Sequence, residues 1–208
     1  MKLTNRWNLL IYRLWSPIYD GLVDRFFFNK GRQRAVEVLA AQAGECLLLV
    51  GVGTGADLPL LPEGVQALGI DLSPDMLAKA RQKLPLNGRQ IGLAIGDAAR
   101  LPTAEAQFDS AVLNLILSVV PDGAACLRET LRSVRPGGRI IVFDKFLPEN
   151  GKLSLGRRFF NIFSTLLGTD VTRRFNLMAE GLDLNLLWEE PSLLHGTYRI
   201  LLLERKAV

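Results

Sequence analysis

Apolar residues between positions 46 and 143 fall into short runs separated by longer stretches of mixed polarity. The run Cys46–Val50 is apolar throughout and lies between glycines, which is typical of a strand buried on both faces. Helix signals separate the runs, such as Ser73 before Pro74. The pattern predicts strands at Cys46–Val50, Ala67–Ile70, Ile91–Ile95, Ser110–Leu113 and Arg139–Phe143, and helices at Arg32–Gln42, 74–83 and Gly123–Val134.

The two ends of the chain carry further elements. Apolar residues recur at steps of three and four near the start, at Leu3, Trp7, Leu10, Leu14 and Ile18. This spacing predicts a helix over residues 3–22, which Pro17 should break or kink. Towards the other end we expect helices at Leu153–Leu167 and Thr169–Glu180 and strands at Leu182–Leu187 and Tyr198–Glu204. Strands alternating with helices indicate an α/β fold around a parallel sheet.

The composition limits the class of protein. The chain has 208 residues, of which 49 % are hydrophobic and 22 % charged, so it is too apolar for disorder. Its uncharged stretches reach only a dozen residues, as at Ser110–Pro121, whereas a membrane-spanning helix needs about 20. The single histidine and two isolated cysteines argue against a metal site.

Charge is distributed unevenly along the chain. The net charge is +4, made up of +5 in residues 1–34, −3 in residues 35–149 and +2 in residues 150–208. The basic surplus therefore lies outside the regular middle section. A basic flank of this kind suits an anionic lipid surface or a nucleic acid, or is simply solvated.

A glycine-rich loop follows the first buried strand. Gly51, Gly53 and Gly55 permit a tight turn and a close approach of a ligand to the backbone. Asp71 lies 20 residues beyond Gly51, where an acid that binds a ribose belongs. With Ala56 the loop also satisfies the dinucleotide fingerprint G-x-G-x-x-A. A nicotinamide oxidoreductase needs a second mononucleotide-binding half, which the chain does not offer.

The order of the later motifs is more specific. Gly96-Asp97 ends the third strand, Phe108-Asp109 precedes the fourth, and Arg135-Pro-Gly-Gly-Arg139 precedes the fifth. This series resembles the class I S-adenosylmethionine-dependent methyltransferases of the small-molecule type, over about residues 47–142. The resemblance implies a Rossmann-like, doubly wound sheet of seven strands, mostly parallel with the last strand antiparallel. It also implies a single domain, with N-terminal lid helices in 1–34, a cofactor-binding core in 35–149 and substrate-side helices with the last two strands in 150–208.

The resemblance assigns roles to individual residues. The three glycines should pass under the methionine part of S-adenosylmethionine, and Asp71 should accept hydrogen bonds from both ribose hydroxyls. Leu72 and Met76 should pack on the adenine. Asp97 should accept from the adenine amino group, and the Ala98 N–H should reach a ring nitrogen. Asn114 and Leu115 should face the methionine end. No metal is implied.

Two positions depart from the family pattern. Many relatives carry an acid just before the first glycine, where this chain has Val50. We therefore expect backbone carbonyls or water to hold the amino group of the cofactor. After the fourth strand, relatives often have two histidines, where this chain has Leu117-Ser118-Val119-Val120-Pro121-Asp122. A substrate role for those histidines is absent.

The N-terminal segment points to a class of methyl acceptor. Tyr12, Trp15, Tyr19 and Asp20 match the entry motif of lipid-modifying members, most closely the bacterial phosphatidylethanolamine N-methyltransferases. The resemblance implies a lid over the cofactor, with Tyr19 as the candidate catalytic residue near the sulfonium. Aromatic and basic residues also alternate in 1–34 and 152–167, which suits peripheral contact with an anionic membrane. We expect no nucleic-acid partner, because no RNA-binding motif accompanies them, and a cytoplasmic protein, peripheral on the inner face of the membrane.

The first expectation is thus methyl transfer from S-adenosylmethionine to a membrane-associated lipid, with a phospholipid amine as the first acceptor. Quinone-type C-methyltransferases share a weaker form of the N-terminal motif, and a soluble small-molecule acceptor is a further alternative. A catalytically dead S-adenosylmethionine-binding partner protein should show damaged cofactor positions, and only the acid before the glycines is missing.

Overall fold

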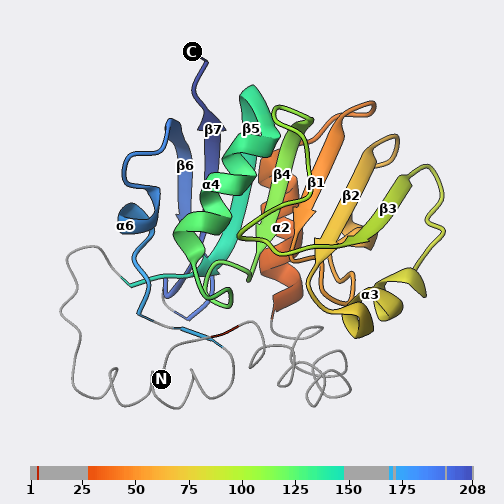
Figure 1. Ribbon diagram of the computed structural model, residues 1–208, viewed down its shortest axis with the longest axis horizontal. Helices are drawn as coiled ribbons and strands as arrows, with labels where there is room; N and C mark the ends of the chain where they lie inside the picture. Colours follow the sequence, from red (N-terminus) through yellow and green to blue (C-terminus); the bar gives the residue numbers. More distant parts are fainter. Residues whose placement is uncertain (1–3, 5–27, 148–168, 171, 195, 208) are drawn as a thin grey trace.

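The computed structural model describes residue 4 and residues 28–147, 169–170, 172–194 and 196–207. Seven strands form one sheet with helices on both faces (Figure 1). The strands are β1 Cys46–Val50, β2 Gln66–Asp71, β3 Gln90–Ile95, β4 Phe108–Asn114, β5 Val134–Lys145, β6 Leu184–Pro191 and β7 Tyr198–Arg205. The helices are α2 Asn29–Leu39, the 3₁₀ turn η2 Leu58–Leu60, α3 Pro74–Arg81, α4 Gly123–Ser133 and α6 Phe175–Ala179.

The sheet has the strand order β3-β2-β1-β4-β5-β7-β6. The pairs β1–β2, β1–β4, β2–β3 and β4–β5 are parallel, and β7 runs antiparallel to both β5 and β6. This confirms the expected doubly wound sheet with an antiparallel last strand. The carboxyl ends of β1 to β5 meet at one edge, at the bottom of Figure 1, and the ligand site of an open α/β sheet belongs there.

Two apolar cores lie on opposite faces of the sheet. On one face, α2 and α3 pack through residues such as Leu39 and Leu77 against Val112 and Phe143. On the other face, α4 and α6 pack through Leu127 and Met178. Strand residues alternate between the cores, as a pleated strand requires. No helix in the described part of the chain is long and apolar enough to cross a bilayer.

Helix ends follow the local signals in the sequence. The Ser73 hydroxyl accepts the Met76 N–H at 3.3 Å and caps α3, with Pro74 at its first position. Asp122 caps α4 by accepting the Ala125 N–H at 2.9 Å. Helix α2 runs from residue 29 to residue 39 instead of 32 to 42, and it ends where Ala40 takes the left-handed conformation with φ 50°.

The helix expected at Thr169–Glu180 is wrong for its first half, since α6 begins only at Phe175. The Asp170 carboxylate accepts both the N–H and the hydroxyl of Thr172, at 2.8 and 2.7 Å, and this local turn competes with a helix. The Asp170 N–H also donates to the Ser118 carbonyl at 2.7 Å. Tertiary bonds to the loop after β4 thus replace the helical ones.

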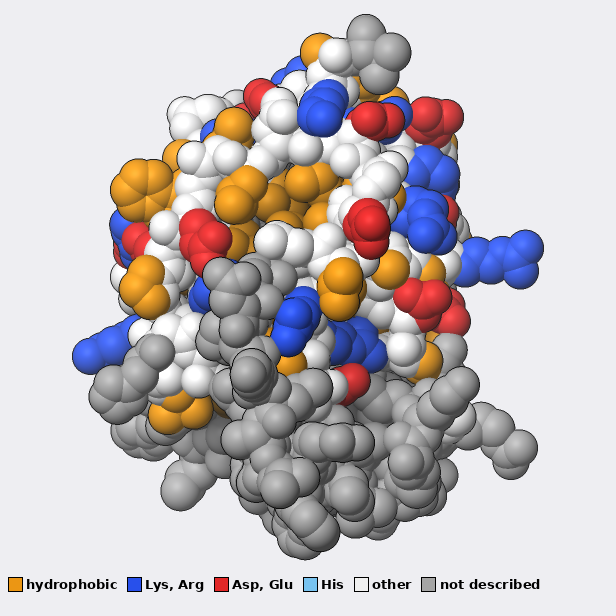
Figure 2. Space-filling view, turned by 90° about the vertical axis from the view of Figure 1, so that its left-hand side faces the viewer, with side chains coloured by type: hydrophobic (Ala, Val, Ile, Leu, Met, Phe, Trp, Pro, Cys, Tyr) orange, Lys and Arg blue, Asp and Glu red, His pale blue; other side chains and the backbone are white. Residues whose placement is uncertain are grey.

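The edge strand β6 is longer than predicted and starts two residues later. Its two glutamates are paired: Glu189 accepts from Arg199 at 2.7 Å, and Glu190 accepts from Arg34 of α2 at 2.8 Å. The strand leaves Leu186, Leu187 and Trp188 about half exposed. Figure 2 faces the β6 and α6 side of the molecule and shows apolar side chains gathered on it.

The packing of α2 on β5 requires glycine at position 31, because a Cβ there would lie 2.3 Å from Cζ of Phe143. Alanine gains about 1 kcal/mol of helix propensity. The overlap with the ring is severe, and overpacking of this kind costs about 1–3 kcal/mol or more. We expect Gly31→Ala to lower both Tm and the free energy of unfolding, as measured by thermal and chemical denaturation.

Gly92→Ala is the matched control, because its Cβ would make only an ordinary contact, 3.5 Å from Leu68 Cδ1. Equal stability of Gly31→Ala and the wild type would contradict this packing.

Candidate active site

The glycine loop leaves β1 and turns back over the end of β2. The N–H groups of Gly51 and Val52 both donate to the Ile70 carbonyl, at 2.8 and 3.0 Å. Gly51, Gly53 and Gly55 all have positive φ, at 70°, 55° and 78°. A Cβ on Gly51 would lie 2.4 Å from Ile116, whereas one on Gly53 would meet nothing nearer than the Gly51 carbonyl oxygen at 4.0 Å. The loop is therefore closely packed against Ile116 at Gly51, while the space beside Gly53 is open.

A cleft at the carboxyl edge collects most of the residues that the sequence singled out. Its lining includes Gly51, Gly53, Asp71, Leu72, Met76, Asp97, Ala98, Asn114 and Leu115. Gly55 lies beneath the loop instead, where a Cβ would be 2.8 Å from Leu58 Cδ1. Tyr19 lies outside the described residues. Nine of the ten expected cofactor residues thus meet in one place.

Asp71 joins the end of β2 to the glycine loop. Its carboxylate accepts the Gly53 N–H at 2.8 Å and the Ser73 N–H at 2.9 Å. Burial raises the pKa of Asp71, and the N–H donors of Ser73, Gly53 and Leu72 oppose that rise. An ionised carboxylate has about four acceptor sites, so capacity is left for donors in the cleft.

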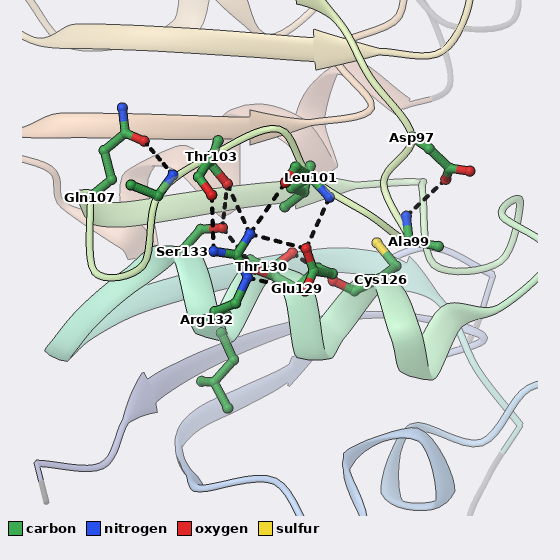
Figure 3. Close-up of polar contacts among 12 residues, drawn as sticks. Asp97, Ala99, Leu101, Thr103, Gln107, Cys126, Glu129, Thr130, Arg132 and Ser133 are labelled. Atoms are coloured by element: carbon green, nitrogen blue, oxygen red, sulfur yellow. Dashed lines mark hydrogen bonds and ion pairs between the residues drawn. The ribbon is translucent and has the colours of Figure 1, made fainter.

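The loop after β3 forms the neighbouring wall of the cleft and is fastened to α4 (Figure 3). Asp97 accepts the Ala99 N–H at 2.9 Å, which fixes the start of the loop. Glu129 accepts the Leu101 N–H at 3.0 Å, and Arg132 donates to the Thr103 carbonyl at 2.9 Å. Arg132 also holds the pKa of Glu129 below its usual range by hydrogen bonding. Glu129 and Arg132 form an ion pair on α4, and their hydrogen bonds to the loop hold the wall that carries Asp97 and Ala98.

A buried polar network at the other end of the cleft was not expected from the sequence. Arg32 of α2 donates to both oxygens of Asp57, at 3.1 and 2.9 Å. The Asn114 amide donates to Asp57 at 2.8 Å, and its own oxygen is buried with no hydrogen-bond partner among the described residues. Arg32 and Asn114 line the cleft. Asn114 thus presents an unsatisfied acceptor beside a ligand-sized space, and such a group calls for a donor.

The turn after β4 completes the lining. Leu115 has φ 60°, and Ile116, Val119, Val120 and Pro121 give this wall an apolar surface. The turn is held from behind by Asp144, which accepts the Ser118 N–H at 2.9 Å. Arg173 stabilises the same turn by donating to the carbonyls of Leu117 and Val120.

Comparison with known proteins agrees with this geometry. A family model described as a methyltransferase domain matches residues 48–142. A phosphatidylethanolamine N-methyltransferase of Cereibacter sphaeroides is 34 % identical over 159 residues, which cover 76 % of this chain and 77 % of that protein. The chain belongs to the S-adenosylmethionine-dependent methyltransferases. It is an enzyme of that family, and S-adenosylmethionine is its cofactor.

Other matches differ in their acceptor. A demethylmenaquinone methyltransferase of Beutenbergia cavernae is 34 % identical over 138 residues, which cover 66 % of this chain and 54 % of that protein. The [4+2]-cyclase SpnF shares the fold with a TM-score of 0.80 at 17 % identity, over 100 % of this chain and 98 % of that one. A geranyl diphosphate methyltransferase solved with S-adenosylmethionine has a TM-score of 0.71 at 15 % identity, over 85 % of each chain. The structural matches show the fold alone, and the two methyltransferase relatives differ in the acceptor that their names give.

The cleft fits the chemistry of the cofactor. S-adenosylmethionine offers an ammonium group and two ribose hydroxyls as donors, and the cleft offers the unpartnered oxygen of Asn114 and the carboxylate of Asp71. The open space above Gly53 leaves room for a ligand against the backbone.

The buried pair of Arg32 and Asp57 should make the methyltransferase sensitive to loss of one partner. Their side chains are 10 % and 5 % exposed, and removing one member of a buried pair costs about 3–5 kcal/mol. We expect a loss of this size for Asp57→Ala in chemical denaturation. The double variant Arg32→Met/Asp57→Leu should recover part of it, because neither charge is left alone, while the Asn114 amide still lacks its acceptor.

Arg135→Ala is the control, since Arg135 pairs with Asp109 at the surface and such pairs contribute about 0–1 kcal/mol. If the stability losses of the two single variants simply add in the Arg32/Asp57 double variant, the two side chains do not act as a pair.

Proposed function

We propose that this methyltransferase transfers a methyl group to the amine of a phosphatidylethanolamine-type phospholipid. The observation that carries the proposal is the 34 % identity to a phosphatidylethanolamine N-methyltransferase across 77 % of that protein's length. The N-terminal motif with Tyr12 and Tyr19 supports it, although both tyrosines lie outside the described residues. A quinone-type acceptor is the second candidate, favoured by the demethylmenaquinone methyltransferase at the same identity over a shorter match.

The proposal assigns the cofactor's adenosine to the half of the cleft nearest β2 and β3. Asp71 accepts hydrogen bonds from the ribose hydroxyls, for which its bonds to Gly53 and Ser73 hold it in place. Asp97 accepts from the adenine amino group, and the Ala98 N–H donates to the ring. Leu72 and Met76 pack against the ring. Each of these residues lines the cleft, which supports the assignment.

The methionine part of the cofactor lies over Gly51 and Gly53 in this proposal. The side chain of Val50 is buried in the core and offers no acceptor, so the ammonium needs a partner other than this side chain. The oxygen of Asn114 is suited to that role, because Asn114 lines the cleft and this buried oxygen has no hydrogen bond to any residue that the structure describes. Asp57 fixes the orientation of the Asn114 amide by accepting from its nitrogen, which turns the oxygen to the opposite side.

Bound S-adenosylmethionine supplies an electrophilic methyl group on its sulfonium. The protein's task is therefore to hold the acceptor in line with that methyl and to exclude water. Leu115 and the apolar turn that ends at Pro121 provide a dry wall at this position. Tyr19 is proposed to cover the opposite side as part of a lid.

Contact with the membrane is part of the proposal. Residues 1–34 carry a net charge of +5, and each basic residue near an anionic surface contributes about 1 kcal/mol. These residues and residues 152–167 are proposed to lie against the inner face of the membrane. The absence of a spanning helix among the described residues is compatible with that.

Asp71 should control both the strength and the pH dependence of cofactor binding. Asp71→Ala should weaken binding of S-adenosylmethionine by about 1.5–3 kcal/mol, because it deletes a charged acceptor for two donors. Protonation of Asp71 should have a similar effect, and burial raises its pKa. Affinity measured by calorimetry should therefore fall as the pH is lowered, starting above the range of an ordinary aspartate, about 3.9.

Asp71→Asn should bind weakly at neutral pH and lose this acid dependence. An Asp71→Ala protein that folds and binds the cofactor as tightly as the wild type would show that Asp71 does not bind the ribose. The wild type should also bind S-adenosylhomocysteine and show no measurable affinity for NADH.

The acceptor is tested with labelled S-adenosylmethionine and vesicles of phosphatidylethanolamine mixed with an anionic phospholipid. We expect labelled lipid from these vesicles and little from vesicles containing demethylmenaquinol. Flotation with the vesicles should decline as salt rises, because salt screens the charge attraction. Arg6→Glu/Arg13→Glu should reduce flotation and leave calorimetric cofactor binding unchanged.

Labelling of the quinol alone would replace the phospholipid proposal with the quinone-type one. Failure of the wild type to float with anionic vesicles at low salt would overturn the membrane contact.

A further inference from the structure

Lys145 is the last residue of β5, the strand next to β4, and stands at the carboxyl edge of the sheet, where the cleft lies. In the parallel register, Asn114 pairs with Phe143, so Lys145 lies two residues, about 7 Å, beyond that row. Phe143 belongs to the core on the α2 face, and Asp144 points to the other face, where it binds the Ser118 N–H. Alternation places Lys145 on the α2 face, which also carries the Arg32–Asp57–Asn114 network.

The Lys145 ammonium is largely removed from water, and the group that it contacts is the face of an aromatic ring. Its nitrogen lies 5.7 Å from the centre of the Tyr198 ring, which stacks with Phe28 and Phe143. Among the residues that the structure describes, this nitrogen forms no hydrogen bond and no ion pair. The charged groups around it are Asp144 on its own strand and Asp170 and Arg173 on the segment that binds the turn after β4.

Burial lowers the pKa of Lys145, because it disfavours the charged form. The negative charges of Asp144 and Asp170 raise the pKa by less than burial lowers it. Neighbouring Arg173 acts in the same direction as burial. A lysine in such a setting is more readily neutral than an exposed one, and a neutral lysine can accept a proton.

We propose that Lys145 accepts the proton that the ammonium head group of the substrate must lose before its nitrogen can attack the methyl group. This proposal rests on the proposed phospholipid amine substrate. The neutral Lys145 nitrogen forms a bond to one proton of the acceptor ammonium and becomes an ammonium itself. The acceptor nitrogen then forms a bond to the methyl carbon while the carbon–sulfur bond breaks, and its electron pair stays on sulfur. Lys145 returns its proton to solvent.

The neighbouring groups that could compete for this role are already engaged. Asp144 accepts the Ser118 N–H at 2.9 Å and the Lys145 N–H at 2.8 Å, on the far face of the sheet. Asp170 accepts two bonds from Thr172 and lies 3.7 Å from the Arg173 guanidinium. Lys145 is the group near this edge whose side chain has no such engagement among the described residues.

The test compares Lys145→Arg and Lys145→Met with the wild type on phosphatidylethanolamine vesicles. Arginine keeps the positive charge but cannot give up its proton. Both variants should lose about 10²–10⁴-fold in kcat, as expected for a lost general base, while calorimetric binding of S-adenosylhomocysteine stays unchanged. The wild-type kcat should rise with pH through a pKa below that of an ordinary lysine, and Lys145→Arg should lack this inflection.

Lys83→Met is the matched control, because Lys83 is exposed beyond the end of α3. It should retain wild-type kcat. Wild-type activity in Lys145→Arg would overturn the proposal, since the residue would then supply only charge.

A second measurement tests the protonation of Lys145 in the absence of any methyl acceptor. Amine labelling of the intact protein over a pH series, read by mass spectrometry, gives the titration of Lys145 beside that of Lys83. Lys145 should titrate at a lower pH than an ordinary exposed lysine does. Titration of Lys145 at or above Lys83 would overturn the proposal. Loss of the proposed function has a different signature, namely no turnover of the phospholipid by the wild type.

Discussion

The hydrogen bonds between the glycine loop and the end of β2 are the interaction on which the site depends. Gly51 and Val52 donate to the Ile70 carbonyl, and Gly53 donates to Asp71. These bonds bring the loop over the edge of the sheet and at the same time aim the Asp71 carboxylate into the cleft. They are possible because β1 and β2 are parallel and in register up to Val50 and Ile70, so that both strands end together.

Local patterns in the sequence were sufficient for the half of the site nearest β2 and β3. The glycines follow the buried strand β1, Asp71 ends β2 and Asp97 lies two residues beyond β3, and the topology of a parallel sheet brings these strand ends to one edge. The network of Arg32, Asp57 and Asn114 could not be predicted in this way, because its members lie 25 and 57 residues apart and come from α2, the turn before η2 and β4. Arg32 looked like one more basic residue of the N-terminal segment. The segment 169–174 was misjudged for a related reason, since its bonds go to Ser118 and its neighbours instead of along a helix.

Charge divides the cleft into two chemical halves. Asp71 and Asp97 lie in the half proposed to hold the adenosine part of the cofactor, while Arg32 and Asn114 line the half proposed for its methionine part. Lys145 stands at the sheet edge beyond Asn114. Between these halves the turn after β4 is apolar, and Asp144 and Arg173 hold it from both sides. In the proposed function, the sulfonium and the acceptor amine meet this apolar surface, and Lys145 is the group proposed to take the departing proton. This arrangement suits methyl transfer to a nitrogen, and the same apolar wall would accept the hydrocarbon part of a lipid.

A crystal structure of this chain with S-adenosylhomocysteine tests the account most directly. The account predicts both ribose hydroxyls on the Asp71 carboxylate and the ammonium of the ligand within hydrogen-bond distance, about 3 Å, of the Asn114 oxygen. It also predicts the ligand's backbone lying over Gly51 and Gly53. A ligand bound in this cleft with its ammonium on another side-chain carboxylate, or with its ribose away from Asp71, would contradict it.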